Sequence, residues 1–142
     1  MVNAVANSVV PKFTFVIGNS YGAGNYAMCG RAFDPRFIFA WPNARFAVMG
    51  AEQASETLFS ILSRAQSRKG KADSDNGDLD ALKKQVRDNY AAQTDIRYAA
   101  SRGWVDAIIQ PEKTREVLIQ SLKLVTRHPA KGARFHTGVL QV

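Results

Sequence analysis

The stretch from Phe13 to Gly30, FTFVIGNSYGAGNYAMCG, decides the fold of this chain. Residues 13–17 form an apolar, β-rich run, which predicts a strand buried on both faces. Residues 18–24 hold three glycines and predict a tight turn. Small and apolar residues follow and predict a helix that ends at Gly30. The order of strand, glycine turn and helix is typical of an α/β protein.

The glycine turn is the segment best suited to chemistry. A turn that opens a helix leaves the first N–H groups of that helix without partners, and the helix dipole adds partial positive charge there. Two neighbouring N–H groups can then stabilise a phosphate or a developing oxyanion. The glycines lack dinucleotide-binding spacing, no P-loop lysine follows, and Ser20 is not in a nucleophile elbow. An oxyanion hole of backbone amides and a plain structural turn remain as alternatives.

Strands and helices alternate along the rest of the chain. A first helix over residues 1–9 is expected to stop before Pro11. Asp78 is expected to cap the N-terminus of a later helix, and Gly103 is expected to end another. Further strands are expected over residues 37–41, 45–49 and 105–109, and further helices over residues 51–65, 79–92, 96–100 and 111–127. The pattern predicts an α/β fold that resembles the later part of a larger domain.

Charge and polarity point to solvated surfaces in the second half of the chain. The 142 residues include 19 lysines and arginines and 12 acidic residues, giving a net charge of +7. Most of the excess lies after residue 62, but it is interleaved with acids, which favours helix faces in water over a nucleic-acid surface. Residues 66–77 are expected to be a polar surface loop, and residues 130–142 a basic and then apolar tail. No internal repeat is visible in the sequence.

Composition excludes several classes of protein. Cys29 is the single cysteine, which excludes a disulfide scaffold and a cysteine-rich zinc module. His128 and His136 have no carboxylate-rich partner segment, so no metal site is expected. No apolar stretch approaches about 18 residues, and no signal peptide is apparent, so we expect no membrane span and a location inside the cell.

Three longer motifs resemble the carboxyltransferase (β) subunit of biotin-dependent acyl-CoA carboxylases. They are SYGAGNYAMCGRA at 20–32, PRFIFAWPNAR at 35–45 and VMGAEQA at 48–54, in the order and spacing of that family. The resemblance runs from Met1 to about Ile109 and is greatest to the 3-methylcrotonyl-CoA and geranyl-CoA type. It implies a crotonase-like fold built from repeated ββα turns. It also implies that residues 1–142 are the C-terminal part of the family's C-domain.

The resemblance implies that carboxyl transfer from biotin takes place at the glycine turn. The family's backbone donors to the biotin ureido oxygen match Ala23 and Gly24, whose amides would stabilise the charge left when carboxybiotin loses CO2. The biotin nitrogen then takes a proton from the acyl-CoA, and the resulting thioester enolate attacks CO2. The amides that hold the thioester oxygen belong to another domain of the family. Tyr26 would shape a pocket for a branched, unsaturated acyl chain, or alternatively only packs the first helical turn. The other residues implied to line the substrate site are Ser20, Tyr21, Gly22 and Asn25.

The resemblance also implies the partners. They are an acyl-CoA substrate, carboxybiotin carried on the biotin carboxylase and carrier (α) subunit, and other β subunits in a homo-oligomer. The location would be the bacterial cytoplasm or the mitochondrial matrix, with no nucleic acid, membrane or metal involved. The expected function is therefore part of such a carboxyltransferase, with a truncated, non-catalytic assembly fragment as the alternative. A basic nucleic-acid-binding protein is a third alternative, which the interleaved acids disfavour.

Overall fold

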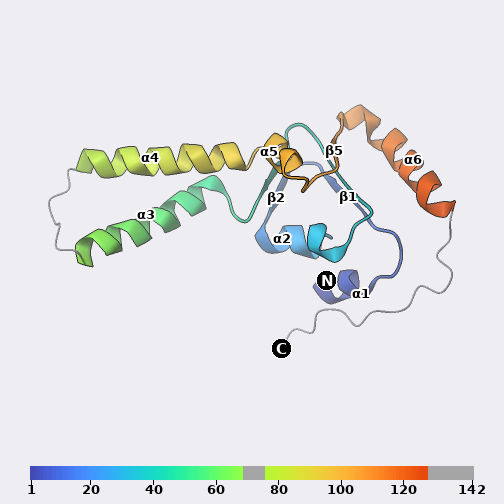
Figure 1. The fold of residues 1–142 in the computed structure, drawn as a ribbon, viewed down its shortest axis with the longest axis horizontal. Coiled ribbons are helices and arrows are strands. Elements are labelled where there is room, and N and C mark those ends of the chain that lie inside the picture. Colours follow the sequence, from blue (N-terminus) through green and yellow to red (C-terminus); the bar gives the residue numbers. More distant parts are fainter. Residues whose placement is uncertain (69–75, 128–142) are drawn as a thin grey trace.

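The computed structural model describes residues 1–68 and 76–127. Two sheets of parallel strands form the body of the molecule (Figure 1). The first sheet has the order β1-β3-β5 and contains β1 (Phe13–Val16), β3 (Phe37–Ala40) and β5 (Ala107–Ile108). The second sheet pairs β2 (Asn19–Tyr21) with β4 (Arg45–Ala47). The expected α/β fold is confirmed.

A ββα path occurs twice in succession. The strands β1 and β2 lead into α2 (Gly22–Ala27), and β3 and β4 lead into α3 (Ala51–Arg68). Equivalent strands of the two units pair in parallel, with Phe13 opposite Phe37 and Asn19 opposite Arg45. The sequence shows no repeat, because parallel pairing rests on backbone hydrogen bonds and does not require matching side chains. The structure thus has the repeated ββα turn that the resemblance implies.

Helices extend from the body in two directions. α3 and α4 (Asn76–Gln93) lie side by side and project as a helical arm (Figure 1). α6 (Thr114–Thr126) projects from the other end, and Trp41 Nε1 donates a hydrogen bond of 2.9 Å to Thr114 Oγ1 at its start. The shorter elements are α1 (Val2–Asn7), α5 (Ile96–Ser101) and the 3₁₀ turns η1 (Arg31–Phe33) and η2 (Pro111–Lys113).

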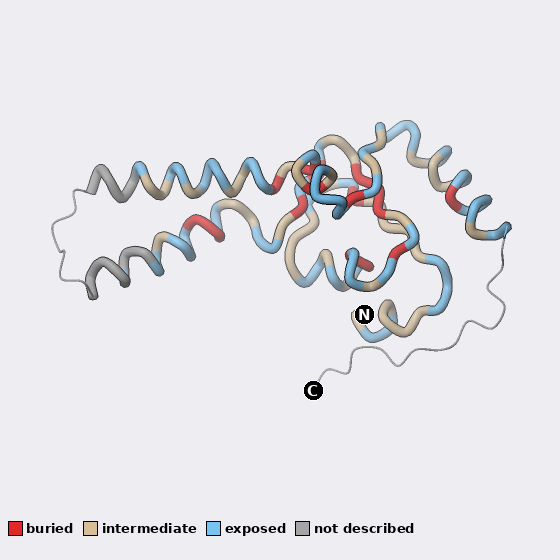
Figure 2. The backbone as a smooth tube through the Cα atoms, in the orientation of Figure 1, coloured by how far each residue is buried: buried red, intermediate tan, exposed pale blue. Residues whose placement is uncertain are grey.

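The hydrophobic core is small and lies in the body. Its members come from both sheets, from the turn before β4, from α5 and from the segment before β5, and they are Val16, Ile38, Ala40, Ala44, Phe46, Ile96, Ala99 and Val105. Ile38 and Ile96 are fully buried, and each side chain contributes about 1.5–3 kcal/mol. Figure 2 shows few buried residues along the arm and α6. Stability therefore depends mainly on the body.

Strand β1 is less buried than the sequence predicts. Phe13, Thr14 and Phe15 are only partly buried, and Val16 alone is buried. The cause is the strand's position, because β1 is at the edge of its sheet whereas β3 is in the centre. An apolar run does not distinguish a central strand from an edge strand.

The predicted glycine turn is shorter than expected, and its helix ends differently. Residues 19–21 form β2, because they pair with β4, and α2 begins at once at Gly22. The left-handed conformation after α2 is taken by Cys29, with φ of 67°, whereas Gly30 has φ of −65°. Thr14 Oγ1 holds this bend by donating a hydrogen bond of 2.8 Å to the Cys29 carbonyl oxygen.

Three helices of the second half, α3, α4 and α6, start or end at other residues than predicted. α3 continues to Arg68, and α4 begins at Asn76, before Asp78 can act as an N-cap. Pro111 opens a 3₁₀ turn rather than α6 itself. Parts of the predicted loop over residues 66–77 thus belong to α3 and α4. Residues 69–75 of that loop, both histidines and the tail over residues 130–142 lie outside the described residues.

The last strand is short because a side chain takes over part of its pairing. Asp106 N donates a hydrogen bond of 2.8 Å to the Ile38 carbonyl oxygen. The Ile38 N–H in turn donates one of 2.7 Å to the Asp106 carboxylate.

Within residues 1–68 and 76–127, no helix is long and apolar enough to cross a membrane.

Candidate functional site

The start of α2 is held against β4 by a glycine. Gly22 has φ of +49°, and a Cβ at this position would lie 2.8 Å from the Val48 carbonyl oxygen. Side chains rarely adopt this conformation, and the β4 segment leaves no space for one. Tyr21 precedes it as the N-cap with extended backbone, and no side chain caps the helix.

Two consecutive backbone amides follow this glycine. Ala23 and Gly24 lie in the first turn of α2, and both are exposed. Among the described residues, neither N–H donates a hydrogen bond, as expected for a first helical turn without a cap. A Cβ built on Gly24 would meet no atom within 4 Å, so the space beside its backbone is open. The two N–H groups can therefore donate to one anion.

A groove of about 480 Å³ lies beside this turn. It is formed by β1, β2, the residues between them and one face of α2. The predicted site residues that line it are Ser20, Tyr21, Gly24 and Asn25. Ala23 does not line the groove, although its N–H immediately precedes that of Gly24 in the chain.

A second cavity, of about 230 Å³, lies on a different face of α2. The predicted site residues that line it are Gly22, Asn25 and Tyr26. Its other walls come from η1 and the residue before it, from β4 and the residue after it, and from Trp104. The structure thus divides the predicted residues between two spaces, and Asn25 alone among them borders both.

Asn25 is oriented by a neighbouring hydroxyl. Ser20 Oγ donates a hydrogen bond of 3.1 Å to Asn25 Oδ1. The Asn25 Nδ2 group has no hydrogen-bond partner in the described part of the chain. It is therefore free to donate to a ligand, and Asn25 borders both the groove and the cavity. The arrangement can hold a polar group of a ligand at this boundary.

Tyr26 is placed for both of the roles considered for it. Its side chain is 55% exposed and lines the cavity, and its ring makes an edge contact with Phe33 at a centroid distance of 6.2 Å. The contact with Phe33 is the packing role, and the exposed face borders the cavity. The two roles are therefore compatible.

An ion pair between Arg31 and Asp106 lies beside the cavity and was not predicted from the sequence. Arg31 is 2.9 Å from the Asp106 carboxylate and donates a second hydrogen bond to the Gly103 carbonyl oxygen. Partial burial raises the pKa of Asp106, but the hydrogen bonds from Arg31 and the Ile38 N–H outweigh it and hold the pKa below its ordinary value. No local pattern reveals this pair, because its members lie 75 positions apart.

Trp104 is also part of the site region. The sequence suggests only a core or interface aromatic at this position, but the indole lines the cavity and is 41% exposed. Its ring packs against Phe46 at 6.2 Å and against Tyr98 at 6.0 Å. Trp104 and α2 are far apart in the sequence, and only the tertiary fold brings them to the same cavity.

Cys29 and two glutamates of α3 line neither the groove nor the cavity. Cys29 is buried, and its thiol contacts the Phe33 carbonyl oxygen at 3.8 Å. Glu52 and Glu56 are exposed on α3 and face lysine and arginine side chains of α4 across a polar groove. Within residues 1–68 and 76–127, no group of three or more His, Cys, Asp or Glu side chains could hold a metal ion.

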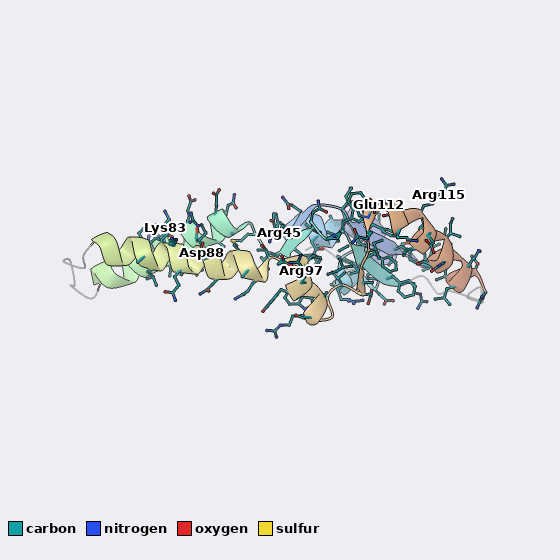
Figure 3. The ribbon with its side chains drawn as sticks, turned by 90° about the horizontal axis from the view of Figure 1, so that it is seen from above. Arg45, Lys83, Asp88, Arg97, Glu112 and Arg115 are labelled. Carbon is teal, nitrogen blue, oxygen red and sulfur yellow. The ribbon has the colours of Figure 1, made fainter. Side chains whose placement is uncertain are left out.

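The basic residues are spread over the molecule. Figure 3 shows Lys83 on the arm, Arg45 and Arg97 near its base, and Arg115 at the start of α6, with the acidic residues Asp88 and Glu112 among them. Arg45 and Arg97 both approach the Asp95 carboxylate, at 3.6 and 3.5 Å. This distribution differs from the continuous basic face of a nucleic-acid-binding surface.

Comparison with known proteins identifies relatives across nearly the whole chain. Residues 1–138 match the family described as carboxyl transferase domain. The biotin-dependent 3-methylcrotonyl-coenzyme A carboxylase beta1 subunit of Mycobacterium tuberculosis is 46% identical over 91% of this chain and 24% of its own. The mitochondrial methylcrotonoyl-CoA carboxylase beta chain of Dictyostelium discoideum is 41% identical over 91% of this chain and 22% of its own. The chain thus spans about a quarter of the length of these relatives.

Solved structures show the same similarity. The beta subunit of geranyl-CoA carboxylase from P. aeruginosa has a TM-score of 0.77 and 39% identity, covering 98% of this chain and 26% of that subunit. Transcarboxylase 12S, a hexamer in a multienzyme core solved with methylmalonyl-coenzyme A, has a TM-score of 0.71 and 30% identity, covering 97% of this chain and 25% of its own. The ββα path described above is therefore shared with carboxyltransferase structures.

Proposed function

The chain belongs to the carboxyl transferase domain family, and from that premise we propose that it forms part of the carboxyltransferase subunit of a biotin-dependent acyl-CoA carboxylase of the methylcrotonyl-CoA type. The observation that carries this proposal is the pair of exposed, unpaired amides at Ala23 and Gly24 beside an open groove. The names and identities of the relatives support the substrate class.

The two amides suit the charge that develops in carboxyl transfer. Carboxybiotin supplies the carboxyl group and is left with negative charge on its ureido oxygen. The N–H groups of Ala23 and Gly24 donate to that oxygen, and the start of α2 adds partial positive charge. They need no rearrangement, because Gly22 fixes the start of the helix against β4. Asn25, oriented by Ser20, adds a donor at the edge of the groove.

The acyl-CoA is bound jointly with parts of the protein outside this chain. We propose that the residues lining the groove and the cavity contact the two substrates, carboxybiotin and the acyl group, with Ser20, Tyr21, Gly22, Asn25 and Tyr26 as the substrate-binding set. The donors to the thioester oxygen come from another domain. Residues 1–142 act as the C-terminal part of the carboxyltransferase C-domain.

The proposed partners are a biotin-carrying α subunit and further β subunits. Exposed apolar side chains on the arm and α6 support packing against other protein, and they include Leu58, Ile61, Ile119, Leu122 and Leu124. The hexamer formed by transcarboxylase 12S supports a homo-oligomer. The bacterial and mitochondrial origins of the relatives support a location in the bacterial cytoplasm or the mitochondrial matrix.

Gly24→Pro in the full-length β subunit, assembled with its α subunit, tests the proposed site. Proline deletes the N–H at position 24 but fits a first helical turn, so carboxylation of 3-methylcrotonyl-CoA is expected to fall about 100–1,000-fold. Gly24→Ala is the matched control, because it keeps the N–H and its Cβ meets open space. Wild-type carboxylation by a folded Gly24→Pro enzyme would refute the proposed role of this amide.

A second function, assembly without turnover, is favoured by the exposed apolar faces of the arm and α6. Mixing this chain with the complementary N-terminal part of the subunit distinguishes the catalytic function from the assembly function. Restored carboxylation supports the catalytic function. A stable complex without carboxylation supports the assembly function.

A further inference from the structure

The two spaces beside α2 differ in chemistry. The groove follows the backbone of residues 14–21 and receives polar groups from Ser20, Asn19 and Asn25. The cavity is bordered mainly by hydrocarbon and aromatic groups, among them Phe46, Val48 and Trp104. Because apolar side chains of β1 and Met28 also line the groove, a ligand with both polar and apolar groups suits it, whereas a purely hydrocarbon chain suits the cavity.

The walls of the cavity are fixed in place. The Trp104 indole is held between Phe46 and Tyr98, and the Tyr26 ring is held by Phe33. Arg31 binds both Asp106 and the carbonyl oxygen of Gly103, the residue before Trp104, and so ties η1 to the segment that carries the indole. A cavity whose walls are supported by such contacts can discriminate between ligands by size.

The volume of the cavity matches a short chain. A water molecule occupies about 30 Å³ in the liquid, so about 230 Å³ accommodates a hydrocarbon of roughly seven non-hydrogen atoms. A branched methylcrotonyl group fits within this volume, whereas a geranyl group exceeds it. The indole of Trp104, which is 41% exposed, is the largest side chain in the wall.

Resting on the proposed function, we propose that the cavity receives the hydrocarbon end of the acyl group and that Trp104 sets the chain length accepted. The biotin ring then occupies the groove, and the short helix α2 separates the two ligands. Asn25 borders both spaces, so the reacting end of the acyl group lies at this boundary. Trp104 is a specificity-determining residue that takes no part in the chemical step.

The test compares two thioesters in the assembled carboxylase. The values of kcat and KM are measured for 3-methylcrotonyl-CoA and geranyl-CoA with the wild type, Trp104→Ala and Trp104→Phe. Removing the indole lengthens the cavity, so Trp104→Ala is expected to raise the ratio of kcat/KM for geranyl-CoA over 3-methylcrotonyl-CoA about tenfold or more. Trp104→Phe is expected to raise it by less, with KM for 3-methylcrotonyl-CoA rising in both variants.

Phe59→Ala is the control, because Phe59 is an aromatic residue on the arm, where it lies near Lys83. This variant is expected to leave the ratio unchanged. If Trp104→Ala does not fold, Trp104→Phe decides alone, since its ring preserves the packing against Phe46 and Tyr98. A ratio that is unchanged in the folded Trp104 variants overturns the proposal.

Calorimetric binding of the same two thioesters gives the ratio of affinities without turnover. A wild-type enzyme that carboxylates neither thioester contradicts the proposed function, and the binding ratios then still test the cavity. A wild-type enzyme that carboxylates 3-methylcrotonyl-CoA, with Trp104 variants that shift neither ratio, contradicts only the role of Trp104.

Discussion

The two ββα units follow the same path but end in different helix starts. α2 begins directly after β2 at Gly22, and its first turn holds no acidic residue. α3 begins three residues after β4 ends, and Glu52 lies in its first turn. A carboxylate in the first turn already compensates the positive end of a helix. The same ββα topology therefore gives two kinds of helix N-terminus. The N-terminus of α2 has no carboxylate and suits an external anion, whereas that of α3 already has one and only begins the arm.

Adding a carboxylate to the first turn of α2 should abolish the difference in charge between the N-termini of α2 and α3. In the full-length enzyme, Ala23→Glu places a negative charge beside the proposed oxyanion, and two like charges about 4 Å apart near a protein surface repel by about 4 kcal/mol. We expect kcat for carboxyl transfer to fall on the order of 100-fold, with the loss reduced at high salt. Ala23→Gln is the control of similar shape. An equal loss in both variants would show that shape, not charge, matters.

Replacing the glycine at the N-terminus of α2 should lower the stability of the fold. Gly22→Ala forces a side chain into a left-handed conformation and against the Val48 carbonyl oxygen. We expect the free energy of unfolding to fall by about 1–3 kcal/mol, measured by urea denaturation. Gly24→Ala, with open space around its Cβ, should change it little. Equal stability of both variants would mean that β4 does not constrain the start of α2.

The ion pair behind the first unit should make stability depend on pH. Because Asp106 has a lowered pKa when folded, the unfolded state binds more protons just below the ordinary carboxyl pKa of about 3.9. Its contribution is present above that pH and is lost as pH falls through the folded pKa. Asp106→Asn should cost about 1 kcal/mol at neutral pH and flatten this acid dependence. An unchanged acid unfolding profile in the variant would contradict the assignment.

The smallest effect is expected on the arm, which continues the second unit. Leu58 and Ile61 are 42% and 56% exposed on α3, so changing both to glutamine should alter the free energy of unfolding by less than about 0.5 kcal/mol each. Association between subunits, followed by sedimentation, should weaken if the arm packs against another copy. A large loss of stability without a change in association would mean that these side chains are already packed within the chain.

The sequence could predict the elements whose periodicity is long or strongly apolar. Strands β1, β3 and β4 and helix α5 appear where they were expected. A helix after the glycine-rich segment could be predicted, but its start at Gly22 lies inside the turn expected over residues 18–24, because β2 pairs with β4 and shortens that turn. The resemblance also predicted the repeated ββα path, which no local pattern in the chain reveals.

Other features depend on tertiary contacts and could not be predicted. Strand β2 has three residues and exists because it pairs with β4. The bend at Cys29 depends on a hydrogen bond from Thr14, a residue of β1. The side chain of Trp104 borders the cavity because α5 and the segment after it fold back toward β4. Hydrophobic patterns report burial along one element and say little about which distant residues meet.

The most direct test of the central claim is a structure of the full-length carboxyltransferase with biotin bound. We expect the ureido oxygen to lie about 2.7–3.1 Å from the backbone nitrogens of both Ala23 and Gly24, with the ring in the groove beside β2. A ureido oxygen bound elsewhere, with these two amides facing water or another protein segment, would contradict it.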